Sequence, residues 1–83
     1  MPASTPHRVV LYARAGCHLC DVARETIAAV RTRHPFDLEE LDVDTDDGLL
    51  RDFGLRVPVV AVDGEEAFEI EVSREALAEL VRT

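Results

Sequence analysis

The chain has 83 residues, enough for one domain with its own core but not for two. Apolar residues make up 47% of it, which excludes intrinsic disorder, and no apolar run is long enough to span a membrane. The net charge of −8 disfavours nucleic acid and anionic membranes as partners, and the absence of lysine excludes Schiff-base chemistry.

The first seven residues contain two prolines and no apolar stretch. They predict a flexible tail over residues 1–7 rather than a secretory signal, followed by a single domain over 8–83. We therefore expect a monomer in the cytoplasm. The domain begins with an apolar run over residues 9–12, which predicts a short buried strand.

Two cysteines follow this strand in the order Cys17-His18-Leu19-Cys20. The residues after them have helical spacing and predict a helix from residue 17 or 18 to 33, because Pro35 excludes its continuation. The first turn of a helix has unpaired N–H groups and favours negative charge, so it stabilises a thiolate. A Cys-x-x-Cys between a strand and a helix is typical of a thioredoxin-like redox motif. The residues expected on the buried face of this helix are Leu19, Val22, Ala23, Ile27 and Val30.

The cysteine pair has three other interpretations. A structural disulfide would close almost no loop, and the stabilisation by a disulfide grows with loop length. A zinc site needs four ligands, and the chain has no second Cys-x-x-Cys. Besides the two cysteines, only its three histidines remain as candidate ligands. Both cysteines could also be buried as small apolar side chains. The position after a strand favours redox chemistry over all three.

The middle of the chain predicts a strand and a short helix. Residues 36–43 predict a strand whose acidic side chains suit the edge of a sheet, parallel to the first strand because a helix connects the two. A helix is expected at about residues 46–53, with Asp44 or Thr45 as its N-cap and Gly54 as its end.

The last part predicts a hairpin and a helix. Residues 55–62 predict a third strand, and the Asp-Gly pair at 63–64 predicts a two-residue turn into an antiparallel strand over 66–71. Ser73 is the expected N-cap of a helix over 74–81. The residues expected to pack this last helix are Ala76, Leu77, Leu80 and Val81. The predicted fold class is therefore α/β, with the order β-α-β-α-β-β-α, a four-stranded mixed sheet and helices on its faces.

Three features together resemble the small glutaredoxin-like proteins of the thioredoxin-fold superfamily. They are the Cys-His-Leu-Cys motif after the first strand, Val57-Pro58 at the start of the third strand, and the order of elements with its Asp-Gly hairpin. The resemblance implies a thiol–disulfide oxidoreductase that reduces disulfides of proteins or of low-molecular-weight compounds. It also implies a redox-active disulfide between the two cysteines, without a further cofactor or a metal.

The resemblance implies a role for each residue of the motif. Cys17 is the nucleophile, and Cys20 is the resolving thiol that releases the reduced product. His18, as an imidazolium, would stabilise the thiolate of Cys17. Pro58 is expected to be cis and to lie beside the cysteines, which leaves the backbone of Val57 free to bind a substrate chain.

Three arginines are expected to gather around the motif. Arg14 precedes it, Arg56 precedes Val57, and Arg74 begins the last helix. We expect the fold to bring them to one end of the sheet, where Arg14 tunes the thiolate and Arg56 and Arg74 attract an anionic group of the substrate. Ser73 matches the capping position that receives the γ-glutamyl carboxylate of glutathione in glutaredoxins.

Two departures from the glutaredoxin pattern bear on the partner. Glu71 and Val72 stand where glutaredoxins have Gly-Gly beside glutathione. We therefore expect glutathione not to be the preferred partner, and the electron donor to be a reductase or another low-molecular-weight thiol. The alternative function is a non-catalytic module of the same fold that binds an iron–sulfur cluster or a protein.

Overall fold

A four-stranded mixed sheet forms the centre of the computed structural model, which describes residues 6–82. Its strands lie in the order β2-β1-β3-β4. β1 pairs in parallel with β2 and antiparallel with β3, and β3 pairs antiparallel with β4. The bounds of the strands are Arg8–Ala13 for β1, Asp37–Asp42 for β2, Val59–Val62 for β3 and Glu65–Glu69 for β4. The predicted mixed sheet is confirmed, with the acidic β2 at an edge.

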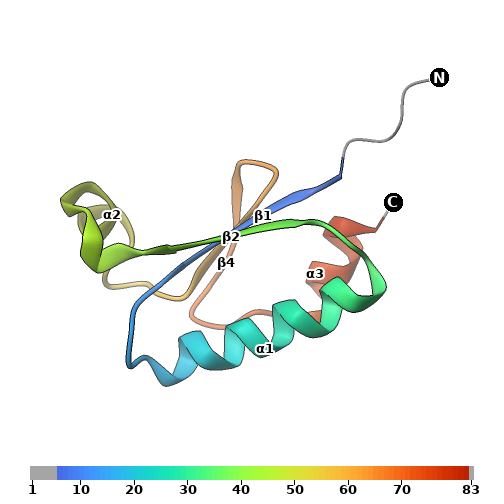
Figure 1. The fold of residues 1–83 in the computed structure, drawn as a ribbon, viewed down its shortest axis with the longest axis horizontal. Helices are drawn as coiled ribbons and strands as arrows, with labels where there is room; N and C mark the ends of the chain where they lie inside the picture. Colours follow the sequence, from blue (N-terminus) through green and yellow to red (C-terminus); the bar gives the residue numbers. More distant parts are fainter. Residues whose placement is uncertain (1–5, 83) are drawn as a thin grey trace.

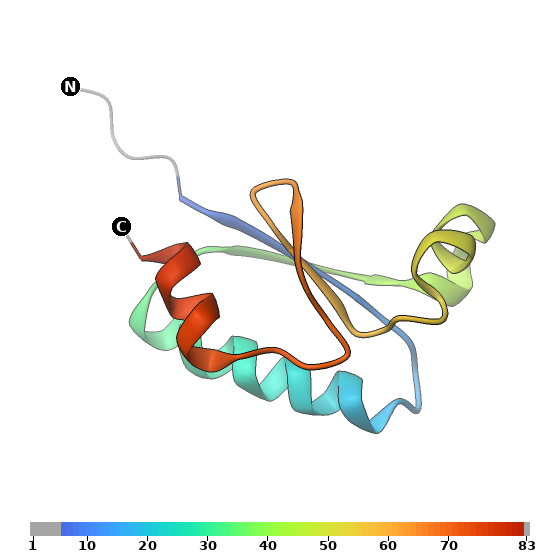
Figure 2. The same ribbon diagram turned by 180° about the vertical axis from the view of Figure 1, so that it is seen from behind.

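The helices connect the strands in the predicted order. Their bounds are His18–Arg33 for α1, Val43–Thr45 for the 3₁₀ turn η1, Asp47–Phe53 for α2 and Arg74–Val81 for α3. α1 and α3 both lie on one face of the sheet (Figures 1 and 2), whereas α2 lies at the end of the sheet where the chain enters α1. Phe53 at the end of α2 stacks on Tyr12, which points to the opposite side of β1 from the core residue Leu11, so α2 contacts the other face of the sheet. The predicted helices on the faces of the sheet are confirmed.

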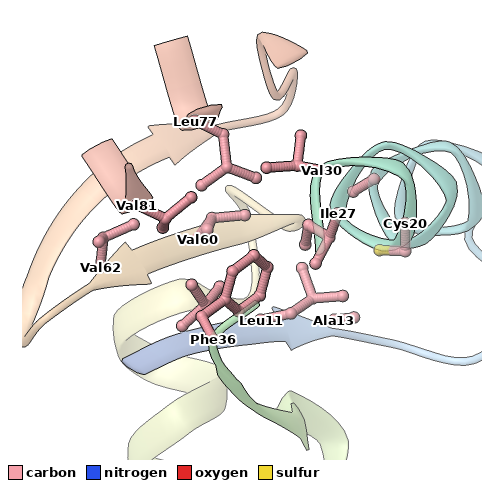
Figure 3. Close-up of a cluster of buried hydrophobic side chains, with 12 residues drawn as sticks. Leu11, Ala13, Cys20, Ile27, Val30, Phe36, Val60, Val62, Leu77 and Val81 are labelled. Carbon is pink, nitrogen blue, oxygen red and sulfur yellow. The ribbon is translucent and has the colours of Figure 1, made fainter. Parts of the chain in front are cut away.

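The core lies between this face of the sheet and the helices α1 and α3 (Figure 3). In α1 the buried side chains are those of Cys20, Ala23, Ile27 and Val30. Our expectation for Leu19 and Val22 was wrong, because each is 44% exposed. The stripe that contacts the sheet begins at Cys20, so its neighbours at 19 and 22 lie on the flank of the helix.

The last helix needs a similar correction. Leu77 and Val81, four residues apart, are the side chains of α3 that are buried in the core. Ala76 is exposed and Leu80 is 45% exposed, so neither packs as expected. The N-cap was predicted correctly, since the hydroxyl of Ser73 accepts a hydrogen bond from the N–H of Ala76 at 3.1 Å.

The start of α2 differs from the prediction, whereas its end at Phe53, with Gly54 as the C-cap, is as predicted. Asp46 is the N-cap and accepts from the N–H of Leu49 at 3.1 Å, because the preceding residues, with Asp44 among them, form η1. Gly54 follows the helix with helical angles, φ −55° and ψ −35°, and not in a left-handed conformation. A Cβ at Gly54 would lie 2.4 Å from the carbonyl oxygen of Leu50, so glycine is required here for close approach of the backbone.

The hairpin has the predicted turn. Asp63 and Gly64 have φ of 53° and 90°, as a two-residue turn between twisted strands requires. β3 begins at Val59, later than expected, and β4 ends at Glu69, before the expected residue 71. β4 ends early because Ile70 has a φ of 70°, which an extended strand cannot contain.

Most of the predicted N-terminal tail, residues 1–5, lies outside the described residues. His7, which we assigned to the tail, is bound to the sheet instead. Its carbonyl oxygen accepts from the N–H of Asp37 at 2.9 Å, and its Nδ1 lies 2.5 Å from a carboxylate oxygen of Asp63. Within residues 6–82, none of the helices has the length and apolar character needed to cross a membrane.

Candidate active site

Cys17 occupies the N-cap position of α1. The chain reaches it through Gly16, whose φ of 73° makes the turn between strand and helix. The sulfur of Cys17 accepts a hydrogen bond from the N–H of Cys20 at 3.2 Å, in the way that a capping oxygen does elsewhere. Because the side chain is half-buried, this sulfur is held by the helix terminus and remains within reach of solvent.

Cys20 is at the inner end of the motif. Its side chain is fully buried at the end of the core cluster, on the side of Ala13 and Ile27 (Figure 3). Burial, together with a hydrogen bond to Cys17, raises the pKa of the Cys20 thiol to about 11, against a weaker opposing effect of the backbone N–H of Arg14. The two cysteines therefore differ in exposure, with Cys17 half-buried and Cys20 fully buried.

The raised pKa of Cys20 predicts a loss of stability at high pH. The folded state favours the neutral thiol, so the extra stability is present below pH 9.0, the ordinary value, and is lost as the pH rises through about 11. We expect the free energy of unfolding to fall by about 2 kcal/mol over this interval from this group alone. Urea denaturation below and above the interval measures it. The Cys20→Ala variant has no thiol, and an equal pH dependence in this control would contradict the assignment.

Pro58 and Val57 lie next to the end of β1. Tyr12 pairs with Val59 in the sheet, and one more step of this register places Pro58 opposite Ala13, the last residue of β1. The Val57–Pro58 bond is cis, as the resemblance implied. In the described part of the chain, neither the N–H nor the carbonyl of Val57 makes a backbone hydrogen bond. Both backbone groups of Val57 are therefore left without a backbone partner in the described part of the chain.

Arg14 is bound to other parts of the chain. Its Nε and Nη2 donate to the two carboxylate oxygens of Asp44 at 3.2 and 3.0 Å, and its Nη1 donates to the carbonyl of Gly54 at 3.3 Å. The guanidinium lowers the pKa of Asp44 through these hydrogen bonds. Arg14 therefore ties the end of β1 to η1 and to the end of α2, and most of its charge is compensated by Asp44.

Arg56 is also paired. Its Nη1 lies 2.8 Å from a carboxylate oxygen of Glu66 and 3.1 Å from one of Glu69, both on β4. Its guanidinium lies 5.4 Å from the ring centre of Phe53, and that ring stacks on Tyr12 at 4.0 Å between centroids. Sequence reasoning missed Asp44, Glu66 and Glu69 as partners of these arginines, because no local pattern joins residues that are so far apart along the chain.

The remaining predicted site residues do not all meet at the cysteines. His18 is the first residue of α1 and is exposed. Arg74 lies in a cleft with Arg33 and His34, toward the far end of α1, so the expectation that it would join Arg14 and Arg56 is wrong. The start of α3 lies near the far end of α1 because α3 packs along the second half of α1. Within residues 6–82, no three histidine, cysteine or acidic side chains are arranged to hold a metal ion.

The order of the strands, the helices α1 and α3 on one face of the sheet, and the Cys-x-x-Cys at the start of α1 define a thioredoxin-fold protein. Structural comparison agrees: a thioredoxin from Halobacterium salinarum covers 93% of this chain with a TM-score of 0.68 at 21% identity, and this chain covers 73% of it. A protein of Nitrosomonas europaea, solved in solution, superposes with a TM-score of 0.82 over 98% of both chains at 24% identity.

The chain belongs to the glutaredoxin-like domain family (DUF836), whose sequence model matches residues 8–82. An uncharacterized protein of Mycobacterium tuberculosis is 37% identical in an alignment that covers 92% of this chain and 84% of that protein. The X-ray structure of a protein from X. campestris is 33% identical, with a TM-score of 0.73 over 86% of this chain and 91% of that one. The glutaredoxin-like resemblance of the sequence is thereby confirmed.

Proposed function

We propose that this protein is a dithiol–disulfide oxidoreductase in which Cys17 is the nucleophile and Cys20 the resolving thiol. The observation that carries the proposal is the difference between the two sulfurs. The sulfur of Cys17 is half-buried and accepts an N–H at the start of α1, an arrangement that stabilises a thiolate. The sulfur of Cys20 is buried and keeps its proton, because its pKa is raised to about 11.

The reaction then proceeds in two exchanges. The thiolate of Cys17 attacks one sulfur of the substrate disulfide, the S–S bond breaks, and the leaving sulfur takes a proton from solvent. Cys20 next loses its proton and attacks the sulfur of Cys17, which releases the second substrate sulfur as a thiol. The substrate gains a pair of electrons and the protein becomes a Cys17–Cys20 disulfide. A reductase or a low-molecular-weight thiol returns it to the dithiol.

Reduction of insulin by dithiothreitol tests this function. We expect catalytic amounts of the protein to accelerate the reaction well beyond dithiothreitol alone, and the midpoint potential of the cysteine couple to lie within the range of known dithiol oxidoreductases. No acceleration would contradict the proposal. The absorbance spectrum of anaerobically purified protein tests the alternative, since visible bands from a bound iron–sulfur cluster would favour the non-catalytic module.

Glutathione is expected to be a poor electron donor. Glu71 places a like charge where the γ-glutamyl carboxylate would bind, and Arg14, which matches the basic position for the other carboxylate, is already bound to Asp44. We expect binding to be weaker than in an ordinary glutaredoxin by about 1–2 kcal/mol, about ten-fold or more in affinity. A glutathione-coupled assay beside a dithiothreitol-driven assay measures the difference.

Two variants, each of which replaces a carboxylate by a neutral amide, provide the control. Glu71→Gln removes the like charge, and Asp44→Asn releases Arg14. Each should raise the glutathione-coupled rate relative to the dithiothreitol-driven rate, and the two together should raise it further. If the unmodified protein turns over with glutathione as fast as an ordinary glutaredoxin does, glutathione is a natural donor and this expectation is wrong.

A further inference from the structure

A cleft lies between the last turns of α1 and the start of α3, two helices that run side by side there (Figures 1 and 2). Its volume of about 520 Å³ is within the roughly 300–1,000 Å³ of sites that hold a small molecule. We call it the Arg33–Arg74 cleft. The charged and polar residues that line it include Arg33, His34, Arg74 and Glu75, and Ala29 and Ala78 add apolar surface.

The two arginines of the cleft differ from the other arginines of the chain in their contacts. The arginines that form ion pairs with carboxylates are Arg8, Arg14, Arg24, Arg51, Arg56 and Arg82. Arg31 donates to the carbonyl of Phe36 at 2.8 Å. Within residues 6–82, neither Arg33 nor Arg74 has a carboxylate at ion-pair distance, although the chain contains 17 acidic residues. The arginines without a protein partner therefore line the same cleft.

Helix electrostatics explains only one of these two positions. Arg33 is in the last turn of α1, where the helix dipole favours a positive charge. Arg74 is the first residue of α3, where the dipole favours a negative charge instead. Its guanidinium thus adds a second positive charge to the cleft against the local preference of its own helix. A negatively charged ligand would compensate both.

The charge balance of the cleft favours a dianionic group. Glu75 is the acidic side chain among the residues that line it, against two guanidinium groups and the half-buried ring of His34. A guanidinium binds phosphate or carboxylate oxygens through a planar pair of N–H groups. A phosphate ester carries a charge of about −1.5 to −2 at pH 7 and three acceptor oxygens, enough for two guanidiniums, whereas a carboxylate has one charge and two oxygens.

The cleft has room and contacts for more than a phosphate. A cleft of about 520 Å³ also holds a carbon skeleton, for which Ala29 and Ala78 offer surface. The carboxylate of Glu75 is an acceptor only, so it suits a hydroxyl group of the ligand and repels a second anionic group. A phosphorylated polyol or sugar combines these features.

The cleft is separate from the cysteine pair. Ala29, the residue of α1 in the cleft that is nearest to Cys17 in the sequence, follows it by more than three helical turns, roughly 16 Å or more along the axis. A ligand in the cleft would therefore bind without contact to the reacting sulfurs.

We propose that the Arg33–Arg74 cleft binds a small phosphate monoester whose carbon skeleton carries hydroxyl groups. Arg33 and Arg74 hold the phosphate from the two helices, and Glu75 accepts a hydrogen bond from a hydroxyl of the ligand. This site goes beyond the proposed redox function and does not depend on it.

Titration of ¹⁵N-labelled protein, followed by its amide resonances, tests the site with ribose 5-phosphate, inorganic phosphate and ribose. Ribose 5-phosphate should shift the amides of the cleft with a Kd below about 1 mM, inorganic phosphate should bind about ten-fold more weakly, and ribose should not bind. Arg33→Gln and Arg74→Gln should each weaken the binding of ribose 5-phosphate about ten-fold or more. The same spectra show that each variant is folded.

Arg51→Gln is the matched control, because it changes the net charge equally. Arg51 lies on α2 with its side chain 77% exposed and contacts only the neighbouring Asp52, at 3.4 Å. This variant should bind ribose 5-phosphate as the unmodified protein does. Absence of saturable shifts in the cleft, or equal affinity in Arg33→Gln, Arg74→Gln and Arg51→Gln, would overturn the site.

Glu75→Ala tests the part of the ligand beyond the phosphate. It should raise the affinity for inorganic phosphate and reduce the preference for ribose 5-phosphate to about three-fold or less. Equal binding of the two ligands by the unmodified protein would overturn the hydroxylated skeleton, and tighter binding of an oligoglutamate peptide would overturn the small molecule in favour of an acidic protein segment. Cys17→Ser should bind ribose 5-phosphate unchanged, so failure of the redox function leaves this test intact.

Discussion

Replacing Cys17 by serine should abolish disulfide reduction, with a rate at least roughly a thousand-fold below that of the unmodified protein. A serine hydroxyl is not ionised near neutral pH and cannot form the mixed disulfide. Cys20→Ser should behave differently, because Cys17 can still attack but nothing releases the product. This variant should accumulate a stable adduct with the substrate through Cys17. Non-reducing electrophoresis and mass spectrometry of the adduct identify the linked residue.

Alkylation of the unmodified protein is the control for these roles. At neutral pH, iodoacetamide should label Cys17 much faster than Cys20, because Cys20 is fully buried and its pKa is raised to about 11. Labelling of Cys20 ahead of Cys17, or an adduct linked through Cys20 in Cys17→Ser, would reverse the assignment of nucleophile and resolving thiol.

Gly54→Ala should destabilise the fold by about 3 kcal/mol and reduce activity with it. The added Cβ would lie 2.4 Å from the carbonyl oxygen of Leu50 and 2.7 Å from its Cδ1, so the backbone after α2 must move. That backbone carries the carbonyl that binds Arg14 and leads directly to Val57. Urea denaturation measures the loss of stability, and the insulin assay measures the loss of activity.

Gly48, which lies inside α2, serves as the control. A Cβ at Gly48 would meet only the ends of two side chains, the closest being a carboxylate oxygen of Asp46 at 3.3 Å. Alanine favours the helix over glycine, so Gly48→Ala should leave the stability unchanged or raise it by up to about 1 kcal/mol. If Gly54→Ala were as stable as Gly48→Ala, the close approach at Gly54 would not matter to the fold.

The order of elements and the position of the cysteine pair at the start of a helix could be predicted from the sequence because each depends on local signals. Helical spacing predicts α1, Pro35 predicts its end at Arg33, and the Asp-Gly pair predicts the hairpin turn at Asp63. Ser73 marks the start of α3 because its hydroxyl caps a backbone N–H only three residues away. Cys17 is an N-cap for the same reason, so its position at the start of a helix was visible in the sequence.

The surroundings of the cysteine pair depend on contacts that local signals do not describe. Arg14 and Asp44 are 30 residues apart, and an arginine in a chain with 17 acidic residues has many candidate partners that only the folded backbone selects. Helical periodicity likewise placed Leu19 on the buried face of α1, whereas packing against the sheet buries Cys20 instead. The left-handed Ile70 contradicts its own residue type and is held by a hydrogen bond to Pro58. The sequence by itself thus determined the fold and the position of the cysteine pair, whereas long-range packing decided which charges are compensated and which apolar side chains remain exposed.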